Sequence, residues 1–252
     1  MAGVVIYFLI SLFSGKDVIG DGVSVQTERE ITPEEEQLAV VAKQILASTE
    51  DIWTAYFSAN GLGEYPKPTM VLYTGTTRSG CGQGSAAMGP FYCSADQCLY
   101  IDLSFFSTMK KQLGADEKEF NYAYVIAHEV GHHVQNVLGV LGKAHQQMAQ
   151  LSKAKANEVS VMIELQADFL AGVWARHENS KFRSLEDGDI ESAIRCAQVI
   201  GDDYLQKKAQ GYVVEESFTH GTSTQRMRWF KKGYQTGDIS PGNTFSYKYS
   251  EL

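Results

Sequence analysis

The feature that most constrains this chain is an apolar segment, residues 120–138, which contains the run AYVIAHEVGHHVQ. The segment is apolar around most of the circumference of a helix and ends at Gly139, which predicts a buried central helix. Buried histidine and glutamate side chains destabilise a fold unless they are paired or bind a metal. The segment therefore predicts a polar cluster with a chemical role inside the core.

His128, Glu129 and His132 form the pattern H-E-x-x-H. Residues i and i+4 lie on one face of a helix, so both imidazoles can point at one ion, and zinc is the ion expected for such ligands. Glu129 lies about 100° further around the helix, where it can take a proton from a water beside the metal. His133 lies about 140° from His128, and we expect it to form ordinary hydrogen bonds behind the site.

Two histidines do not complete a catalytic zinc site, which normally uses three protein ligands and a water. The pattern H-E-x-x-H-x-x-G-x-x-H would need glycine and histidine where Gln135 and Leu138 stand, so that class of peptidase is excluded. The run ELQAD offers Glu164 and Asp168, again four residues apart in an apolar helical segment. We assign Glu164 to the metal and Asp168 to the spare N–H of a ligand histidine. The alternative, a pair of surface acids, is weaker because this helix has little polar face.

The remaining pattern predicts more helices and a few strands. A capping box at residues 32–35, with Pro33 at the first helical position, predicts a helix that ends near residues 60–61. Later helices are predicted at residues 146–177, at residues 186–209 with a break near Gly201, and from a cap at Thr222 or Ser223 to Gly237. Strands are predicted at residues 69–75 and 98–106. The expected fold class is α+β, mostly helical, with a small β-sheet and the buried H-E-x-x-H helix.

The first 31 residues are expected to lie outside the folded domain. Residues 4–13 form an apolar run that is too short to cross a bilayer, which takes roughly 20 residues. This run is either the trimmed end of a membrane anchor or a segment that packs on the domain. Residues 20–31 are polar and without periodicity, which predicts a linker. We therefore divide the chain into an anchor end with its linker, residues 1–31, and a domain, residues 32–252.

Charge and cysteine spacing narrow the class of protein. The formal net charge of −8 argues against nucleic acid or anionic lipid as the main partner. The four cysteines lack the tight C-x₂-C pairs of zinc ribbons. They indicate either a disulfide-stapled loop, which needs an oxidising compartment, or buried thiols in a cytosolic protein.

An H-E-x-x-H helix followed by E-x-x-A-D resembles the gluzincin type of zinc peptidase, which includes the membrane-embedded CAAX-processing and heat-shock peptidases. The chain more closely resembles the bacterial putative neutral zinc metallopeptidase family, in the runs CGQGSAAMGPFYCSADQCLYIDLSFF, AYVIAHEVGHHVQ, ELQADFLAGVWA, IGDDYLQ and FTHGTSTQRMRWF. The resemblance implies a zincin-like metallopeptidase domain in the bacterial cell envelope. It also implies that this extracytoplasmic domain follows a single N-terminal membrane anchor.

The resemblance assigns roles to further residues. Cys81 and Cys93 match the family pattern and would close a loop, whereas Cys98 and Cys196 lie outside it and could form a second bridge. His220, in the run FTHGTS, is by analogy with the late histidine of gluzincins a donor to the oxyanion of peptide hydrolysis. The alternative for His220 is a turn histidine that caps the last helix.

Two weaker candidates for the oxyanion donor and one candidate substrate-binding strand complete the expected site. Arg226 and Tyr204 are further candidates for the oxyanion donor. The run LYIDL, residues 99–103, is either an edge strand that pairs with an extended peptide substrate or an interior strand.

The expected function is zinc-dependent hydrolysis of a peptide or protein substrate. Zn²⁺ would be held by His128, His132 and Glu164, with Glu129 as the general base. The alternative is a non-hydrolytic envelope protein, a zinc-stabilised scaffold or a partner-binding protein. A structural zinc site needs no general base and usually has a fourth protein ligand, so Glu129 favours the enzyme.

Overall fold

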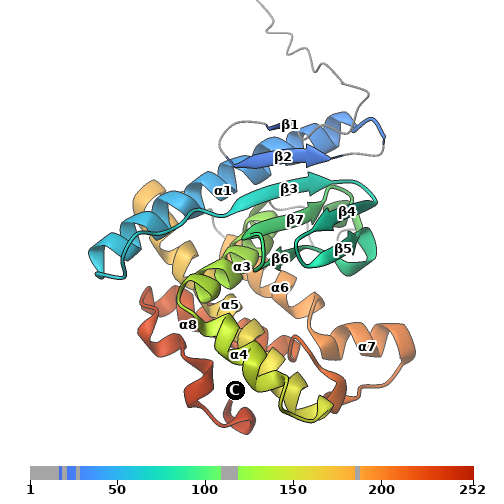
Figure 1. The fold of residues 1–252 in the computed structure, drawn as a ribbon, viewed down its shortest axis with the longest axis vertical. Helices are drawn as coiled ribbons and strands as arrows, with labels where there is room; N and C mark the ends of the chain where they lie inside the picture. The colour runs from blue at the N-terminus through green and yellow to red at the C-terminus, as the bar shows by residue number, and fades with distance from the viewer. Residues whose placement is uncertain (1–16, 19–21, 27–28, 109–118, 185–187) are drawn as a thin grey trace, which may run out of the picture.

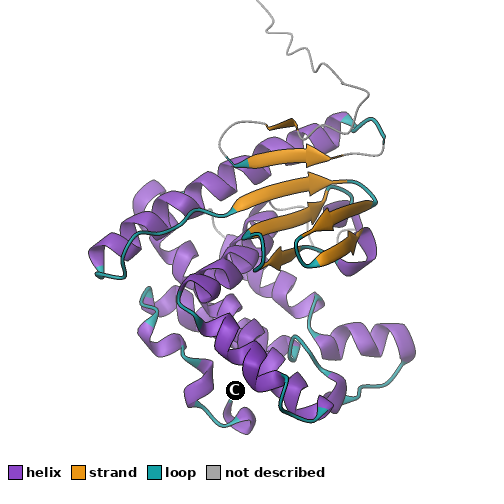
Figure 2. Cartoon of the chain, viewed as in Figure 1, coloured by secondary structure: helices purple, strands orange, loops and turns teal. Residues whose placement is uncertain are grey.

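The computed structural model describes residues 17–18, 22–26, 29–108, 119–184 and 188–252, and the apolar run at residues 4–13 lies outside them. Within this described part of the chain, no helix is long and apolar enough to cross a membrane. Figure 1 shows a sheet with one long helix along its face, joined to a layer of packed helices. Helices dominate and the sheets are small (Figure 2), so the prediction of a mostly helical α+β fold is confirmed.

The main sheet has the strand order β1-β2-β3-β7-β6. Its central strands β2, β3 and β7 run parallel, and the outer strands β1 and β6 are antiparallel to their neighbours. The strands are β1 (Asp17–Val18), β2 (Val23–Gln26), β3 (Thr69–Tyr73), β7 (Cys98–Asp102) and β6 (Phe91–Cys93). A separate hairpin is formed by β4 (Thr76–Ser79) and β5 (Gly82–Ser85).

One prediction about this sheet is wrong, and one open alternative is decided. The segment predicted as a linker contains β2, which pairs with β3 with Val23 opposite Met70. This short strand carries serine and glutamine, so its place in the sheet depends on its neighbour more than on its own apolar pattern. The strand β7 lies between β3 and β6, so of the two alternatives the run LYIDL is the interior strand. The outer strands of the sheet are β1 and β6.

Alternate residues of the central strands face two apolar clusters. Leu99 and Ile101 of β7 pack in the main core, with residues of α1 (Pro33–Ala59) and α3 (Glu119–Val137). Tyr100, between them, faces the opposite side of the sheet and stacks on Phe91. The helix α1 begins at the predicted capping box and covers the first of these faces (Figure 1).

The helical layer carries most of the candidate site residues named from the sequence. Its helices are α2 (Phe105–Thr108), α4 (Val140–Met148), α5 (Lys153–Phe182), α6 (Asp189–Val199), α7 (Asp202–Gln210) and α8 (Ser223–Thr236). The break near Gly201 and the stop at Gly237 are as predicted. The predicted helix at residues 146–177 is instead two helices, because α4 ends at Met148 and α5 begins at Lys153.

Glycine lets α5 lie close to a helix on each side. A Cβ on Gly131 of α3 would lie 2.9 Å from the Ala167 carbonyl oxygen of α5. A Cβ on Gly233 of α8 would collide with the Phe169 backbone carbonyl of α5. Since only glycine avoids these contacts, α3, α5 and α8 can bring their side chains to one buried point.

Candidate metal centre

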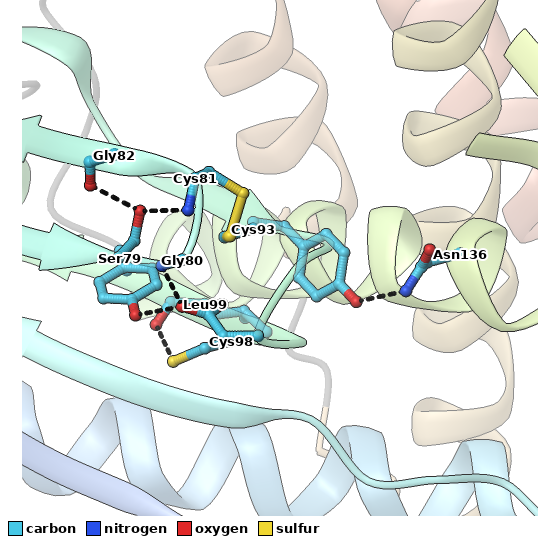
Figure 3. Close-up of a disulfide and its surroundings, with 11 residues drawn as sticks. Ser79, Gly80, Cys81, Gly82, Cys93, Cys98, Leu99 and Asn136 are labelled. Atoms are coloured by element: carbon cyan, nitrogen blue, oxygen red, sulfur yellow. Dashed lines mark hydrogen bonds between the residues drawn. A yellow bond between two sulfur atoms is a disulfide. The ribbon is translucent and has the colours of Figure 1, made fainter. Parts of the chain in front are cut away.

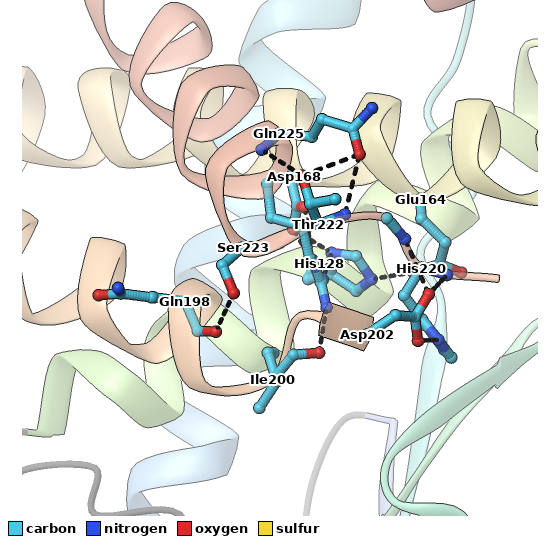
Figure 4. A network of polar contacts seen from close by, with 12 residues as sticks. His128, Glu164, Asp168, Gln198, Ile200, Asp202, His220, Thr222, Ser223 and Gln225 are labelled. Carbon is cyan, nitrogen blue, oxygen red and sulfur yellow. Dashed lines mark hydrogen bonds and ion pairs between the residues drawn. The ribbon is translucent and has the colours of Figure 1, made fainter. Parts of the chain in front are cut away.

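Three side chains that sequence spacing assigned to a metal converge between α3 and α5. Glu164 Oε2 lies 3.1 Å from His128 Nε2, and Glu164 Oε1 lies 3.4 Å from His132 Nε2. One ligand atom from each of the three residues lies within 4.8 Å of the others. Figure 4 shows the His128 imidazole directed toward Glu164. The cluster joins two turns of one helix to a single turn of another.

The second ring nitrogen of His128 is held by an ionised acid. His128 Nδ1 lies 2.8 Å from Asp168 Oδ1, and Asp168 also accepts hydrogen bonds from Arg226 and Tyr124. An ionised carboxylate only accepts, so Nδ1 of the imidazole carries a hydrogen, and Nε2 is the nitrogen that can bind an ion once its own proton is lost. The structure therefore places Asp168 against Nδ1 of His128, the ring nitrogen opposite the one that faces Glu164.

The second ring nitrogen of His132 is held by a neutral amide. His132 Nδ1 lies 2.9 Å from Gln135 Oε1. The Gln135 amide nitrogen donates to the Ile163 carbonyl oxygen at 2.8 Å and to Gln166 Oε1 at 2.9 Å, which turns its own oxygen toward His132. In the sequence, Gln135 serves only to exclude the peptidase class whose motif needs a glycine at that position. Its spacing of three residues from His132, on the same face of the helix, was the signal that could have found this contact.

Charges around the cluster shift several pKa values. Burial lowers the pKa of His128, but Asp168 and Glu164 outweigh it and raise this pKa to about 10 in the absence of a metal. Burial raises the pKa of Asp168, but Arg226 and His128 outweigh it and lower this pKa to about 2. The pKa of Glu164 lies well below its usual value because the neighbouring His132 and His220 oppose the effect of burial. Both acids are therefore ionised at neutral pH.

Glu129 is buried beside the cluster, with 7% of its surface exposed. Burial raises its pKa above the usual value, against the charges of His128 and His132, which lower it. A glutamate with a raised pKa is a better proton acceptor and a better proton donor near neutral pH. Its position and its pKa both suit proton transfer.

His133 points away from the cluster, as its angle on the helix predicts. Its Nδ1 lies 2.9 Å from the Tyr92 hydroxyl, and its Nε2 lies 2.6 Å from the Pro66 carbonyl oxygen. Burial lowers its pKa. His133 thus joins α3 to β6 and to the loop before β3.

His220 lies at the rim of the cluster, with a half-exposed side chain. Asp202 Oδ2 accepts hydrogen bonds from three successive backbone N–H groups, those of Thr219, His220 and Gly221. Asp202 Oδ1 lies 3.3 Å from His220 Nδ1, and His220 and Asp202 lie next to Glu164 in Figure 4. Partial burial lowers the pKa of His220, but the carboxylates of Glu164 and Asp202 outweigh it and raise this pKa.

The contacts at the start of α8 decide whether His220 caps this helix and whether Arg226 can donate to an oxyanion. The last helix is capped by the Thr222 side chain, which accepts from the Gln225 N–H in a capping box, so His220 does not cap it. Arg226 directs Nε and Nη2 at Asp168 and Nη1 at the Ile200 carbonyl oxygen, so its donors are engaged away from a substrate and it is a poor candidate for the oxyanion donor. Asp202, which orders the turn around His220, had no assigned role in the sequence because its contact depends on the packing of α7 against α8.

One disulfide ties the hairpin to the edge strand. Cys81, in the turn between β4 and β5, is bonded to Cys93 of β6 with an S–S distance of 2.05 Å (Figure 3). The predicted bridge between Cys98 and Cys196 is wrong, because both are buried thiols in different layers, one on β7 and one on α6.

The donor set fits zinc. Two imidazoles with their Nδ1 atoms engaged, and one ionised carboxylate, are a set of three protein ligands that catalytic zinc sites use. Oriented imidazoles of this kind normally have hydrogen-bond partners such as Asp168 and Gln135. Among the described residues, the group that could hold a metal contains no cysteine.

Comparison with known proteins identifies the family. Residues 2–245 match the family described as putative neutral zinc metallopeptidase. The uncharacterized protein YpfJ of Escherichia coli (strain K12) is 49% identical over 245 residues, 95% of this chain and 84% of the relative. The uncharacterized proteins Mb2605 of Mycobacterium bovis and Rv2575 of Mycobacterium tuberculosis are each 43% identical over 191 residues, 72% of this chain and 64% of the relative. No solved structure matches the chain. The sequence motifs, the convergent cluster and these matches together place the chain in the putative neutral zinc metallopeptidase family.

Proposed function

We propose that the protein is a zinc-dependent endopeptidase, with Zn²⁺ held by His128, His132 and Glu164. The observation that carries the proposal is the convergence of these three side chains beside the buried Glu129. When bound, zinc polarises the scissile carbonyl group and lowers the pKa of a water. The cluster has three candidate ligands among the described residues, which is the number that leaves a position for substrate.

Glu129 is the general base and then the general acid of this reaction. It takes one proton from the attacking water, whose oxygen forms a bond to the peptide carbonyl carbon. It then delivers that proton to the amide nitrogen as the C–N bond breaks, so one water is consumed and a carboxylic acid and an amine are formed. The remaining proton of the acid passes to the amine, which leaves as an ammonium group beside a carboxylate. The raised pKa of Glu129 favours the first transfer, because the carboxylate of a weaker acid is a stronger base toward the water proton.

His220 is the donor to the oxyanion that develops during this attack. The Asp202 carboxylate holds the His220 backbone N–H at 2.6 Å, which fixes the turn at the rim of the cluster. Its side chain is 51% exposed, so it can reach a substrate that enters from solvent. The raised pKa of His220 increases the fraction that carries a positive charge near neutral pH.

The substrate is a peptide or protein in an extended conformation, and the open edge of β6 is its docking strand. Among the described residues, β6 pairs with β7 alone. The Tyr92 hydroxyl lies 2.9 Å from His133 and accepts from Asn136 at 3.0 Å, so β6 is held beside the helix that carries the metal ligands. An extended peptide adds to such an edge through main-chain hydrogen bonds.

The proposed location is the extracytoplasmic side of the bacterial cell envelope, with a membrane anchor at the N-terminus. The disulfide between Cys81 and Cys93 supports an oxidising compartment. The net charge of −8 supports a protein substrate in preference to nucleic acid.

Glu129→Gln tests the mechanism. The variant should bind one zinc ion with unchanged affinity, while hydrolysis of a quenched fluorescent peptide library falls by at least about 100-fold, the usual contribution of a general base. The control is Glu191→Gln, which changes an exposed glutamate on α6. Full activity in Glu129→Gln would overturn the assigned base. A wild-type protein that binds zinc but cleaves no peptide would instead support the scaffold alternative.

A further inference from the structure

The hydrogen bonds on Asp168 extend the metal centre beyond its ligands. Asp168 Oδ1 accepts from His128 Nδ1 at 2.8 Å, from the Tyr124 hydroxyl at 2.6 Å and from Arg226 Nη2 at 2.9 Å. Asp168 Oδ2 accepts from Arg226 Nε at 2.8 Å. Each oxygen of the carboxylate is thus fixed by a donor that comes from a different helix than Asp168 itself.

We propose that Arg226 and Tyr124 are positioning residues for the metal centre, which act through Asp168. Together they hold the Asp168 carboxylate in one place and one plane, and this sets the direction of the His128 imidazole and of its Nε2. The inference rests on the zinc site of the proposed function and does not depend on peptide hydrolysis.

The charge of Asp168 requires a partner in the core. Asp168 is fully buried and Arg226 is 3% exposed, so neither charge is stabilised by water. A buried ion is costly unless a counter-ion and good hydrogen bonds accompany it. The guanidinium of Arg226, from α8, supplies both to an acid on α5. Without it, the buried carboxylate would lose its counter-ion and two of its hydrogen-bond donors, and nothing from α8 would hold it against the Nδ1 of His128.

The geometry of the contact fixes direction as well as charge. The planar guanidinium of Arg226 places two parallel N–H bonds on the two oxygens of one carboxylate, which lysine cannot do with a single ammonium group. Tyr124 lies four residues before His128, so both side chains lie on one face of α3 and meet the same oxygen. Asp168 is therefore aligned with α3 by Tyr124 and with α8 by Arg226. The remaining contacts of Arg226 are longer, at 3.4 Å to the Tyr124 hydroxyl and 3.5 Å to the Ile200 carbonyl oxygen. Arg226 Nη2 also lies 3.4 Å from His128 Nδ1, but that nitrogen donates its hydrogen to Asp168 at 2.8 Å and has no lone pair to offer the guanidinium.

The test measures metal binding in four variants and a control. Arg226→Met removes the positive charge and the two parallel N–H donors to Asp168, whereas Arg226→Lys keeps the charge without the parallel donors. Tyr124→Phe removes one hydrogen-bond donor to Asp168, and Asp168→Asn removes the ionised acceptor. The control, Arg228→Met, lies on the same helix and loses only a contact at 3.2 Å with the Glu251 carbonyl oxygen. Zinc affinity is measured by competition with a chromogenic chelator, ligand geometry by the visible spectrum of the Co²⁺-loaded protein, and folding by thermal unfolding.

We expect Arg226→Met to weaken zinc binding by about 10- to 100-fold, the usual effect of losing a group that orients a metal ligand. The zinc affinity of Arg226→Lys should lie between that of Arg226→Met and that of the wild type, and the zinc affinity of Tyr124→Phe should be a few-fold weaker than that of the wild type. The Co²⁺ spectrum should change in each of these variants. The control should match the wild type. In the double variant Asp168→Asn with Arg226→Met, zinc affinity should equal that of Asp168→Asn alone, because Arg226 acts only through the missing carboxylate.

Several outcomes would overturn the proposal. Wild-type zinc affinity and an unchanged Co²⁺ spectrum in Arg226→Met, with only a lower melting temperature, would show that Arg226 stabilises the fold alone. Additive losses in the double variant would show that it acts by another route. If Arg226→Met does not fold, unchanged metal binding in both Arg226→Lys and Tyr124→Phe gives the same negative answer. None of these readings requires turnover, so an inactive wild-type protein would contradict the proposed function and leave this inference intact.

Discussion

The two imidazoles of the metal cluster are held by partners of different kinds. His128 is held by Asp168, a buried acid whose charge is balanced by Arg226 from α8. His132 is held by Gln135, a neutral amide on its own helix that is fixed in turn by the backbone of α5. One side of the cluster thus depends on an ion pair between distant parts of the chain, and the other depends mainly on short-range contacts.

The difference means that the two ligands should respond differently to change. A charged contact in the core is strong while complete and costly when one partner is lost. A neutral hydrogen bond contributes less, and its loss costs less. The four predictions that follow test this contrast, from the largest expected effect on the site to the smallest.

Asp168→Ala should have the largest effect, because it leaves the Arg226 charge buried without a counter-ion. The free energy of unfolding of the metal-free protein should fall by about 3–5 kcal/mol, measured by urea denaturation. The matched change Glu158→Ala, on the same helix, removes a partly exposed ion pair with Lys155 and should cost less than about 1 kcal/mol. Equal losses in the two variants would contradict the importance of the buried pair.

The pH dependence of the free energy of unfolding of the metal-free protein should come from His128 and its contact with Asp168. The pKa of His128 in the fold, about 10, lies above its unfolded value near 6.5, so its protonation stabilises the fold below pH 6.5 and this contribution is lost as pH rises through 10. Zinc must displace this proton, so its apparent affinity should rise up to about tenfold per pH unit between pH 7 and 9.

Chelator competition at several pH values, together with urea denaturation of the metal-free protein, measures both trends. In Asp168→Asn the slope of zinc affinity against pH should flatten, because the main cause of the raised His128 pKa is gone. A slope that stays the same in this variant would contradict the assigned cause.

Gln135→Leu should have a smaller effect, because it removes a neutral acceptor. The variant leaves His132 Nδ1 and the Ile163 carbonyl oxygen without their partner, so the free energy of unfolding should fall by about 1–3 kcal/mol. Zinc affinity should weaken by about tenfold or less, at the low end of the range for such contacts. A loss larger than that in Asp168→Ala would reverse the contrast between the two ligands.

His133→Asn should leave zinc binding unchanged, because His133 contacts Tyr92 and Pro66 on the other side of α3. The loss of these two hydrogen bonds should lower the free energy of unfolding by about 1–2 kcal/mol. Zinc stoichiometry and thermal unfolding measure the two effects. A reduced stoichiometry would mean that His133 contributes to the metal site after all.

The parts of this site that sequence spacing predicts are those set by short-range geometry. His128 and His132 share a helix face because they are four residues apart, and the caps at Thr32 and Thr222 lie three residues from their partners. The contact between Arg226 and Asp168 spans 58 residues and depends on how α8 crosses α5. No local pattern in the sequence reports that crossing.

In the sheet, too, features that depend on long-range pairing are not predicted by the sequence. The strand β2 is too short and polar to be recognised alone, and it is stabilised by pairing with β3. Whether LYIDL lies inside or at the edge of the sheet depends on where β6 pairs, which no residue of LYIDL encodes. Cys98 and Cys196 could form a bridge as far as the sequence shows, but their positions on β7 and α6, in different layers, separate them.

The place of Arg226 on α8 also sets an order of events during synthesis. All the residues of the cluster, up to Glu164 and Asp168, leave the ribosome before the segment that contains Arg226. Until that segment has docked, Asp168 lacks the Arg226 counter-ion that it has in the folded protein. On the proposed role of Arg226, the chain would carry its candidate metal ligands before their geometry is complete, and maturation of the centre would wait for α8.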